Sequence, residues 1–235
     1  MDIPYYGMVV VTIAVFLTMY LLRNHRKSMK KMGFISWIAL SVYFLIEYIV
    51  IQRTTAPYQW LKQPMSDLGV TTCGPDTHPL ASYVICSPGH LWMNWTFTLT
   101  GLCIIMGAIG LHSCWPASRQ TRIATALWVV YGLSYTISGI IPADVNFLWH
   151  TLGSLPGMLV QIPALVLIGL AIRKEMPLLS RWTFFCALVT TSVLLLIMLQ
   201  PVFTQFPGGL LQRIFYAAAY VWMSVTAIAL WLSRR

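Results

Sequence analysis

Residues 32–51 read MGFISWIALSVYFLIEYIVI, and Glu47 is the only charged residue among them. An α-helix rises about 1.5 Å per residue, so about 20 apolar residues cross the roughly 30 Å hydrocarbon core of a bilayer. This stretch therefore predicts a transmembrane helix that carries one carboxylate near its end. Because charge is costly inside a membrane, Glu47 is a candidate functional residue.

Six further apolar stretches flank this one, at residues 5–22, 91–111, 123–142, 155–172, 183–199 and 214–232. Hydrophobic residues make up 58% of the chain and charged residues 9%, whereas soluble domains carry about 25% charged residues. The sequence therefore predicts an all-α integral membrane protein, with a bundle of seven transmembrane helices in a single domain over residues 1–235. Pro156 and Pro163 predict a bend in the fifth helix.

The net charge of +9 is explained by where the basic residues fall along the chain. If residues 23–31 are cytoplasmic, twelve of the 15 Lys and Arg residues lie on the cytoplasmic side, and Arg53, Lys62 and Arg213 lie outside. Cytoplasmic loops of membrane proteins are enriched in positive charge. The pattern predicts an external N-terminus and a cytoplasmic C-terminus, and it argues against a nucleic-acid partner.

Residues 52–90 form the one long loop, which is predicted to be extracytoplasmic. It contains five prolines, which disfavour a long helix. Cys73 and Cys86 both lie in this loop, and a disulfide between them is possible in an oxidising compartment. The spacing of these two cysteines with His78 and His90 matches no common zinc-binding pattern.

Polar residues gather at the predicted outer ends of the helices. Asp67, Asp144, His150 and Glu47 are candidates for acid–base catalysis or cation binding. Asn94, Arg213 and His90 are candidates for binding the polar part of a substrate, since an arginine among apolar helices suits an anionic headgroup. Two interpretations stay open: a functional site that opens to the outer leaflet, or a structural network of ion pairs and helix caps.

Four short motifs carry a family resemblance. They are Ser66-Asp67-Leu68-Gly69, Asn94, Ile141-Pro142-Ala143-Asp144 followed by His150, and the segment from Gly209 to Arg213. Their order and spacing resemble the DUF998 family of prokaryotic multi-pass membrane proteins, from the second predicted span to the last. Since that family has no assigned activity, the resemblance implies an architecture, a prokaryotic plasma-membrane location and a set of important polar residues.

The leading functional hypothesis is a protein that binds or modifies a lipid-soluble substrate at this outer-leaflet polar site. Its predicted partners are membrane lipids or that substrate, and neither a cofactor nor a metal is specified by the sequence. The alternatives are a proton-coupled transporter that uses Glu47, and a structural or accessory membrane subunit. A small terpene cyclase fits less well, because the last span contains no carboxylate.

Overall fold

The computed structural model describes residues 3–200, 202 and 206–233, and throughout that part the regular secondary structure is helical. Seven helical segments among the described residues are long and apolar enough to cross a membrane. They are α1 (Ile3–Leu22), α2 (Arg26–Ala39) together with α3 (Val42–Gln52), α4 (His90–Gly110), α5 (Arg119–Ile140), α6 (Phe147–Ile172), α7 (Pro177–Leu199) and α8 (Gly208–Leu232). Two short 3₁₀ turns, η1 (Met65–Gly69) and η2 (His112–Cys114), lie in the connections.

The second predicted span is broken into two helices. The helix stops at Leu40 and Ser41, where the Ser41 hydroxyl donates to the Ile38 carbonyl at 2.9 Å. The Tyr43 amide donates to the carbonyl of Leu40, three residues back, at 3.1 Å. Serine hydroxyls compete with the helical backbone in this way, so the regular helix is interrupted here, although Leu40 and Ser41 keep helical dihedral angles.

The last three helices begin well before the predicted spans. The α6 helix starts at Phe147 rather than 155, α7 at Pro177 rather than 183, and α8 at Gly208 rather than 214. Hydropathy marks the most apolar stretch of a helix and misses first turns that are followed by polar or charged residues, such as His150, Arg181 and Arg213 here. In α6 the Asn146 side chain caps the first turn by accepting from the Trp149 amide at 3.1 Å.

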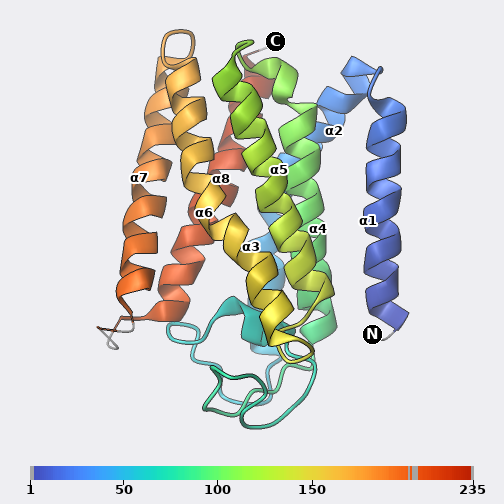
Figure 1. The fold of residues 1–235 in the computed structure, drawn as a ribbon, viewed down its shortest axis with the longest axis vertical. Helices are drawn as coiled ribbons and strands as arrows, with labels where there is room; N and C mark the ends of the chain where they lie inside the picture. The colour runs from blue at the N-terminus through green and yellow to red at the C-terminus, as the bar shows by residue number, and fades with distance from the viewer. Residues whose placement is uncertain (1–2, 201, 203–205, 234–235) are drawn as a thin grey trace.

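The predicted proline bend lies inside one continuous helix. Both Pro156 and Pro163 are within α6, which runs unbroken over 26 residues. A proline in a helix removes one hydrogen bond and crowds the carbonyl four residues back. Figure 1 shows α6 changing direction in its lower half and leaning away from α7.

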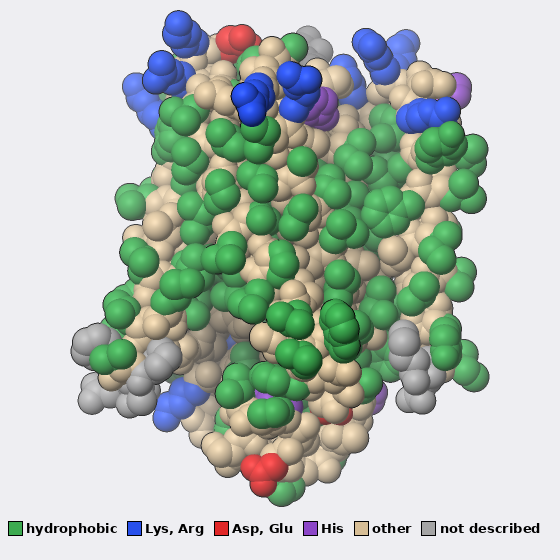
Figure 2. Space-filling view, in the orientation of Figure 1, with side chains coloured by type: hydrophobic (Ala, Val, Ile, Leu, Met, Phe, Trp, Pro, Cys, Tyr) green, Lys and Arg blue, Asp and Glu red, His purple; other side chains and the backbone are tan. Residues whose placement is uncertain are grey.

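The two ends of the bundle differ in charge and in structure. The loop of residues 53–89 folds over the end that also holds the start of α1; we call this the loop end (Figure 1). Lysine and arginine side chains gather at the opposite, basic end on the face in Figure 2. The charge separation that underlies the predicted orientation is therefore present along the bundle axis, and the side that faces the cytoplasm stays a prediction.

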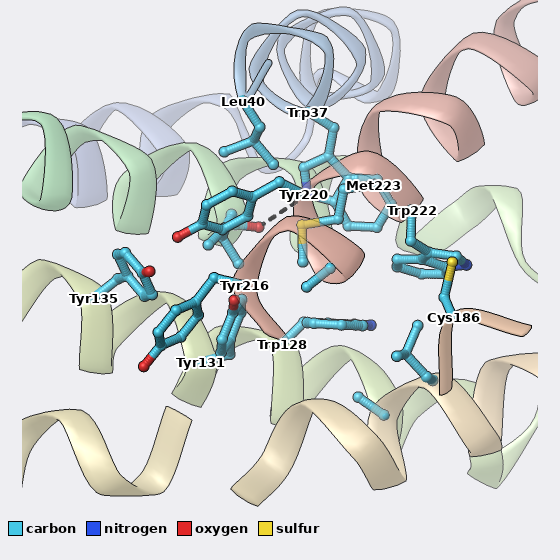
Figure 3. Close-up of a cluster of buried hydrophobic side chains, with 14 of the residues drawn as sticks. Trp37, Leu40, Trp128, Tyr131, Tyr135, Cys186, Tyr216, Tyr220, Trp222 and Met223 are labelled. Atoms are coloured by element: carbon cyan, nitrogen blue, oxygen red, sulfur yellow. Dashed lines mark hydrogen bonds between the residues drawn. The ribbon is translucent and has the colours of Figure 1, made fainter. Parts of the chain in front are cut away.

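The core is unusually rich in aromatic residues. Trp128 of α5 stacks on Trp222 of α8 with ring centroids 5.2 Å apart, and Trp222 also contacts Trp37 of α2 at 5.5 Å. Figure 3 shows these rings together with a group of buried tyrosines from α5 and α8. These ring contacts, one stacked and one tilted, join α2, α5 and α8 in the core.

Glycines let α4 and α5 approach closely. A Cβ atom on Gly101 would overlap the carbonyl of Gly132 and the hydroxyl of Thr136. A Cβ on Gly132 would lie 2.6 Å from the Gly101 carbonyl oxygen. Small residues at such crossings are the usual basis of helix packing in membranes, where apolar burial adds little. The backbones of α4 and α5 are therefore in close contact at Gly101 and Gly132.

We expect Gly101→Ala to destabilise the protein by about 1–3 kcal/mol, because overpacking a close contact forces backbone shifts. Gly7→Ala is the matched control, since a Cβ there would make an ordinary contact with Trp95 at 3.5 Å. Thermal unfolding of both variants in the same detergent measures the difference. An equal melting temperature for the two would show that α4 and α5 tolerate a wider separation.

Candidate functional site

Asp67 lies at the centre of the loop end and is completely buried. The 3₁₀ turn η1 presents its carboxylate to two side chains of the same loop. Tyr83 donates its hydroxyl to Oδ2 at 2.7 Å, and His78 Nε2 lies 3.1 Å from Oδ1. Both carboxylate oxygens are thus engaged, and Asp67 folds the loop around itself.

The protonation of this cluster follows from its hydrogen bonds. His78 Nδ1 accepts from the Leu80 amide at 3.3 Å, so the ring proton belongs on Nε2 and is donated to Asp67. The His78 ring stacks on Phe147, with centroids 5.5 Å apart. Burial, followed by the hydrogen bond to the Asp67 carboxylate, raises the pKa of Tyr83, so this phenol remains a neutral donor.

Asn94 fastens the same turn to the helices. Its amide nitrogen donates to the Gly69 carbonyl at 2.8 Å and to the Tyr5 hydroxyl at 3.1 Å, which links η1, α4 and α1. A Cβ at position 69 would overlap the Asn94 side chain. His90, at the first residue of α4, has its Nδ1 3.0 Å from the Ser87 carbonyl. Both residues therefore hold the end of the loop.

Asp144 anchors the loop at a second point. Its Oδ2 accepts four hydrogen bonds from the amides and hydroxyls of Thr71 and Thr72, at 2.7–3.1 Å. Its Oδ1 is buried and has no hydrogen-bond partner among the described residues. Asp144 therefore clamps the loop to the connection between α5 and α6.

Glu47 and Arg213 form an ion pair between α3 and α8, with Nε 2.9 Å from Oε1. Glu47 is 6% exposed. A buried carboxylate without a partner is strongly disfavoured, so each residue stabilises the charge of the other. The pair lines a small cavity of about 230 Å³, whose walls include Tyr43, Tyr216 and Tyr220.

The remaining donors of Arg213 hold the loop. Nη1 donates to the carbonyls of Trp60, Gln63 and Gly209 at 2.7, 3.1 and 3.0 Å, and Nη2 donates to the Tyr58 hydroxyl at 2.7 Å. Tyr58 in turn donates to the Pro64 carbonyl at 2.9 Å, and burial raises its pKa, so it stays neutral. With these donors committed, Arg213 has little capacity left for an anionic ligand.

A larger hollow, the main cavity, lies between the loop and the helices α5, α6, α7 and α8. It has a volume of about 490 Å³. Its lining combines polar residues (Lys62, Ser66, His78, Ser134, Ser138, His150, Thr151, Ser154, Gln200 and Gln212) with apolar and aromatic ones (Pro64, Met65, Leu80, Tyr83, Phe97, Tyr135, Phe147, Leu155, Met158, Ile197 and Tyr216). Figure 2 shows this side of the molecule hollowed near the loop end, where α6 leans away from α7 (Figure 1).

His150 is the one residue of the seven predicted catalytic and binding residues that lines the main cavity. Its Nδ1 lies 2.7 Å from the Ile141 carbonyl and must donate to it, so in the neutral ring Nε2 is an acceptor. The hydroxyls of Ser138 and Ser154 donate to the carbonyls of Ser134 and Thr151 in their own helices. Among the described residues the structure shows no hydrogen bond between a hydroxyl of this cavity and His150.

The seven predicted residues thus divide among separate arrangements. Glu47 pairs with Arg213; Asp67 and Asn94 meet at η1; Asp144, His90 and His150 each contact a different segment. In the described part of the chain no three His, Cys, Asp or Glu residues are grouped to hold a metal ion. From the sequence His78 was considered only as a zinc ligand and Tyr83 not at all, although their position between two loop cysteines was a usable signal for a site.

Cys73 and Cys86 are joined by a disulfide. The adjacent residues Gly74 and Ile85 exchange backbone hydrogen bonds of 2.9 and 3.0 Å, so the disulfide closes a short two-stranded neck. His78 and Tyr83 lie in the segment that this neck closes. The disulfide therefore restricts the part of the loop that covers the main cavity.

We expect Asp67→Asn to loosen this loop without unfolding the helices. In asparagine an NH₂ group replaces one carboxylate oxygen, and it cannot accept the hydrogen bond from His78 or Tyr83 that this oxygen accepted. Losing such a buried acceptor costs about 1–3 kcal/mol. Limited proteolysis within residues 53–89 should become faster, while helix content is unchanged. Asp76→Asn, at an exposed acid of the same loop, is the control, and equal cleavage rates for the two variants would contradict a holding role for Asp67.

The chain was also compared with known proteins. Neither the curated proteins nor the solved structures gave a match. A family model described as "Protein of unknown function (DUF998)" matches residues 37–229, from α2 to α8, and so includes the polar clusters described above apart from Tyr5 of α1. The chain therefore belongs to the DUF998 family, for which that description gives no activity.

Proposed function

We propose that this protein binds an amphiphilic, lipid-soluble molecule in the main cavity, with the polar head of the molecule at the loop end. The observation that carries the proposal is the mixed lining, in which Lys62, Gln200 and Gln212 lie near the loop end and Phe97, Met158 and Tyr216 lie further along their helices. A volume of about 490 Å³ falls within the range of about 300–1,000 Å³ that is usual for small-molecule sites.

The depth of the cavity suits a membrane ligand. Met158 lies eleven residues after Phe147, the first residue of α6, which corresponds to about 16 Å of helix at 1.5 Å per residue. This is about half of the roughly 30 Å hydrocarbon core. A ligand with its head beside Lys62 and its tail beside Met158 would span one leaflet. The predicted orientation makes this the outer leaflet of a prokaryotic plasma membrane.

The chemistry of the lining favours binding over catalysis. Lys62 is the one formally charged side chain of the lining, and the hydroxyls and amides beside it are donors and acceptors. The carboxylates of Asp67, Asp144 and Glu47 are engaged in holding the loop and α8. The ligand class is therefore an amphiphile with an anionic or hydroxyl-bearing head, and His150 is the group nearest to an acid–base role.

The same engaged carboxylates support one alternative, an accessory membrane subunit. In that case the loop end would serve only to stabilise the bundle. A transporter that uses Glu47 as a proton carrier would need this carboxylate to separate from Arg213, which lies 2.9 Å away.

We expect native mass spectrometry of the protein in lipid nanodiscs to detect a retained amphiphile. In Ser154→Phe the affinity for this amphiphile should fall by about tenfold or more. Ser154 lines the main cavity, so a phenyl ring there occupies the ligand's volume. Leu159→Phe is the control, because Leu159 lies on the same helix and is 53% exposed. Lys62→Gln should weaken retention only if the head is anionic.

The melting temperature of each variant in the same nanodiscs verifies folding. Retention that is equal in folded Ser154→Phe and wild type would place the ligand elsewhere. A wild type that retains no defined molecule would favour the accessory subunit.

A further inference from the structure

A groove on the side of the bundle lies apart from the main cavity. This side groove, of about 550 Å³, runs between α3 and α4, and its lining includes Ala39, Tyr43, Trp92, Leu99, Thr100 and Cys103. Two features of the sequence border it. The helix is interrupted at Leu40 and Ser41, beside the groove, and α4 contributes the small side chains of positions 96, 100 and 103 to the wall.

The side groove is apolar and open to its surroundings. Trp92 is 51% and Leu99 45% exposed. The Thr96 hydroxyl donates to the Trp92 carbonyl of its own helix at 2.7 Å, so it adds no free donor to the wall. In a bilayer these surfaces would contact hydrocarbon, and the groove would be filled by it.

The length of the side groove indicates what kind of molecule fits it. Trp92 and Cys103 are eleven residues apart on α4, about 16 Å at 1.5 Å per residue. This matches one leaflet, or one acyl chain, rather than the roughly 30 Å that a partner's transmembrane helix needs. A second transmembrane helix, about 10 Å wide, would also extend past the end of the groove.

A cation stands at the loop end of the groove. Arg53 directly follows α3, and its guanidinium lies 4.5 Å from the centroid of the Trp92 ring that lines the groove. Arg53 is exposed, and among the described residues no carboxylate lies within ion-pair distance of it. A guanidinium held over an aromatic ring keeps its N–H groups available for a phosphate, in contrast to the committed donors of Arg213.

From these observations we infer that the side groove is a phospholipid site, in which one acyl chain fills the groove and the phosphate pairs with Arg53. Trp92 serves both parts of the lipid. Its ring positions Arg53 for the headgroup and forms the wall of the groove at the loop end, beside the acyl chain. This placement agrees with the enrichment of tryptophan and arginine at membrane interfaces.

The first test uses delipidated protein titrated with phosphatidylglycerol in native mass spectrometry. The wild type should bind one lipid more tightly than the rest, and Arg53→Gln and Thr100→Trp should each weaken this first binding step by about tenfold. Arg23→Gln is the matched control, since Arg23 also stacks on a ring, Tyr20, at 3.8 Å but does not border the side groove. Unchanged affinity in Arg53→Gln would overturn the proposal, as would an equal loss in Arg23→Gln.

The second test needs no variant and so is independent of folding defects. Phosphatidylglycerol with a diazirine at the end of one acyl chain is incorporated into nanodiscs with the wild type and activated by light. The labelled peptide should come from α4 around Leu99 to Cys103. Labelling there no stronger than at the lipid-exposed Leu188 of α7, which is 66% exposed, would show bulk lipid contact and overturn the proposal, and a dimer in the mass spectrum would assign the groove to a second copy.

The two proposed sites are distinguishable. Ser154→Phe acts on the main cavity and should leave phosphatidylglycerol labelling of α4 unchanged. Arg53→Gln acts on the side groove and should leave the amphiphile of the main cavity in place.

Discussion

The loop end depends on the burial of one guanidinium. Arg213 lies at the start of α8 among apolar helices, and a charge in such a place is stable only when it is paired and its donors are used. Glu47 neutralises it from α3, and three backbone carbonyls together with the Tyr58 hydroxyl take further N–H groups. Meeting these requirements brings α3, α8 and the loop of residues 53–89 together.

Two carboxylates complete the attachment of the loop by the same physical rule. Asp67 accepts hydrogen bonds from His78 and Tyr83 of the same loop. Asp144, which lies outside the loop, accepts them from Thr71 and Thr72. Each acid is stabilised by the donors that it organises, as buried polar groups must be. Their shared effect is to hold a structured cover over the main cavity, so the acids shape the site while the hydroxyls, Lys62 and His150 line it.

Much of the fold was predictable because hydropathy reports directly on membrane spans. The seven apolar stretches correspond to the seven helical segments, and the asymmetry of charge corresponds to the two ends of the bundle. The break at Leu40 and Ser41 was missed, since a local backbone hydrogen bond from one serine leaves mean hydropathy unchanged. The early starts of α6, α7 and α8 were missed because polar or charged residues interrupt their first two turns, such as His150 in α6, Arg181 in α7 and Arg213 in α8.

The sequence by itself determined which residues form helices long and apolar enough to cross a membrane, and that polar residues gather at one end of these helices, because both properties depend only on residue type and order. The tertiary structure alone decided which polar groups meet. Arg213 contacts the carbonyl of Gln63 from 150 residues away, and Asp144 contacts Thr71 from 73 residues away. Periodicity describes neighbours along one helix, whereas hydrogen-bond partners, cavities and grooves arise from helices packed side by side, so the division between holding residues and lining residues emerged only in three dimensions.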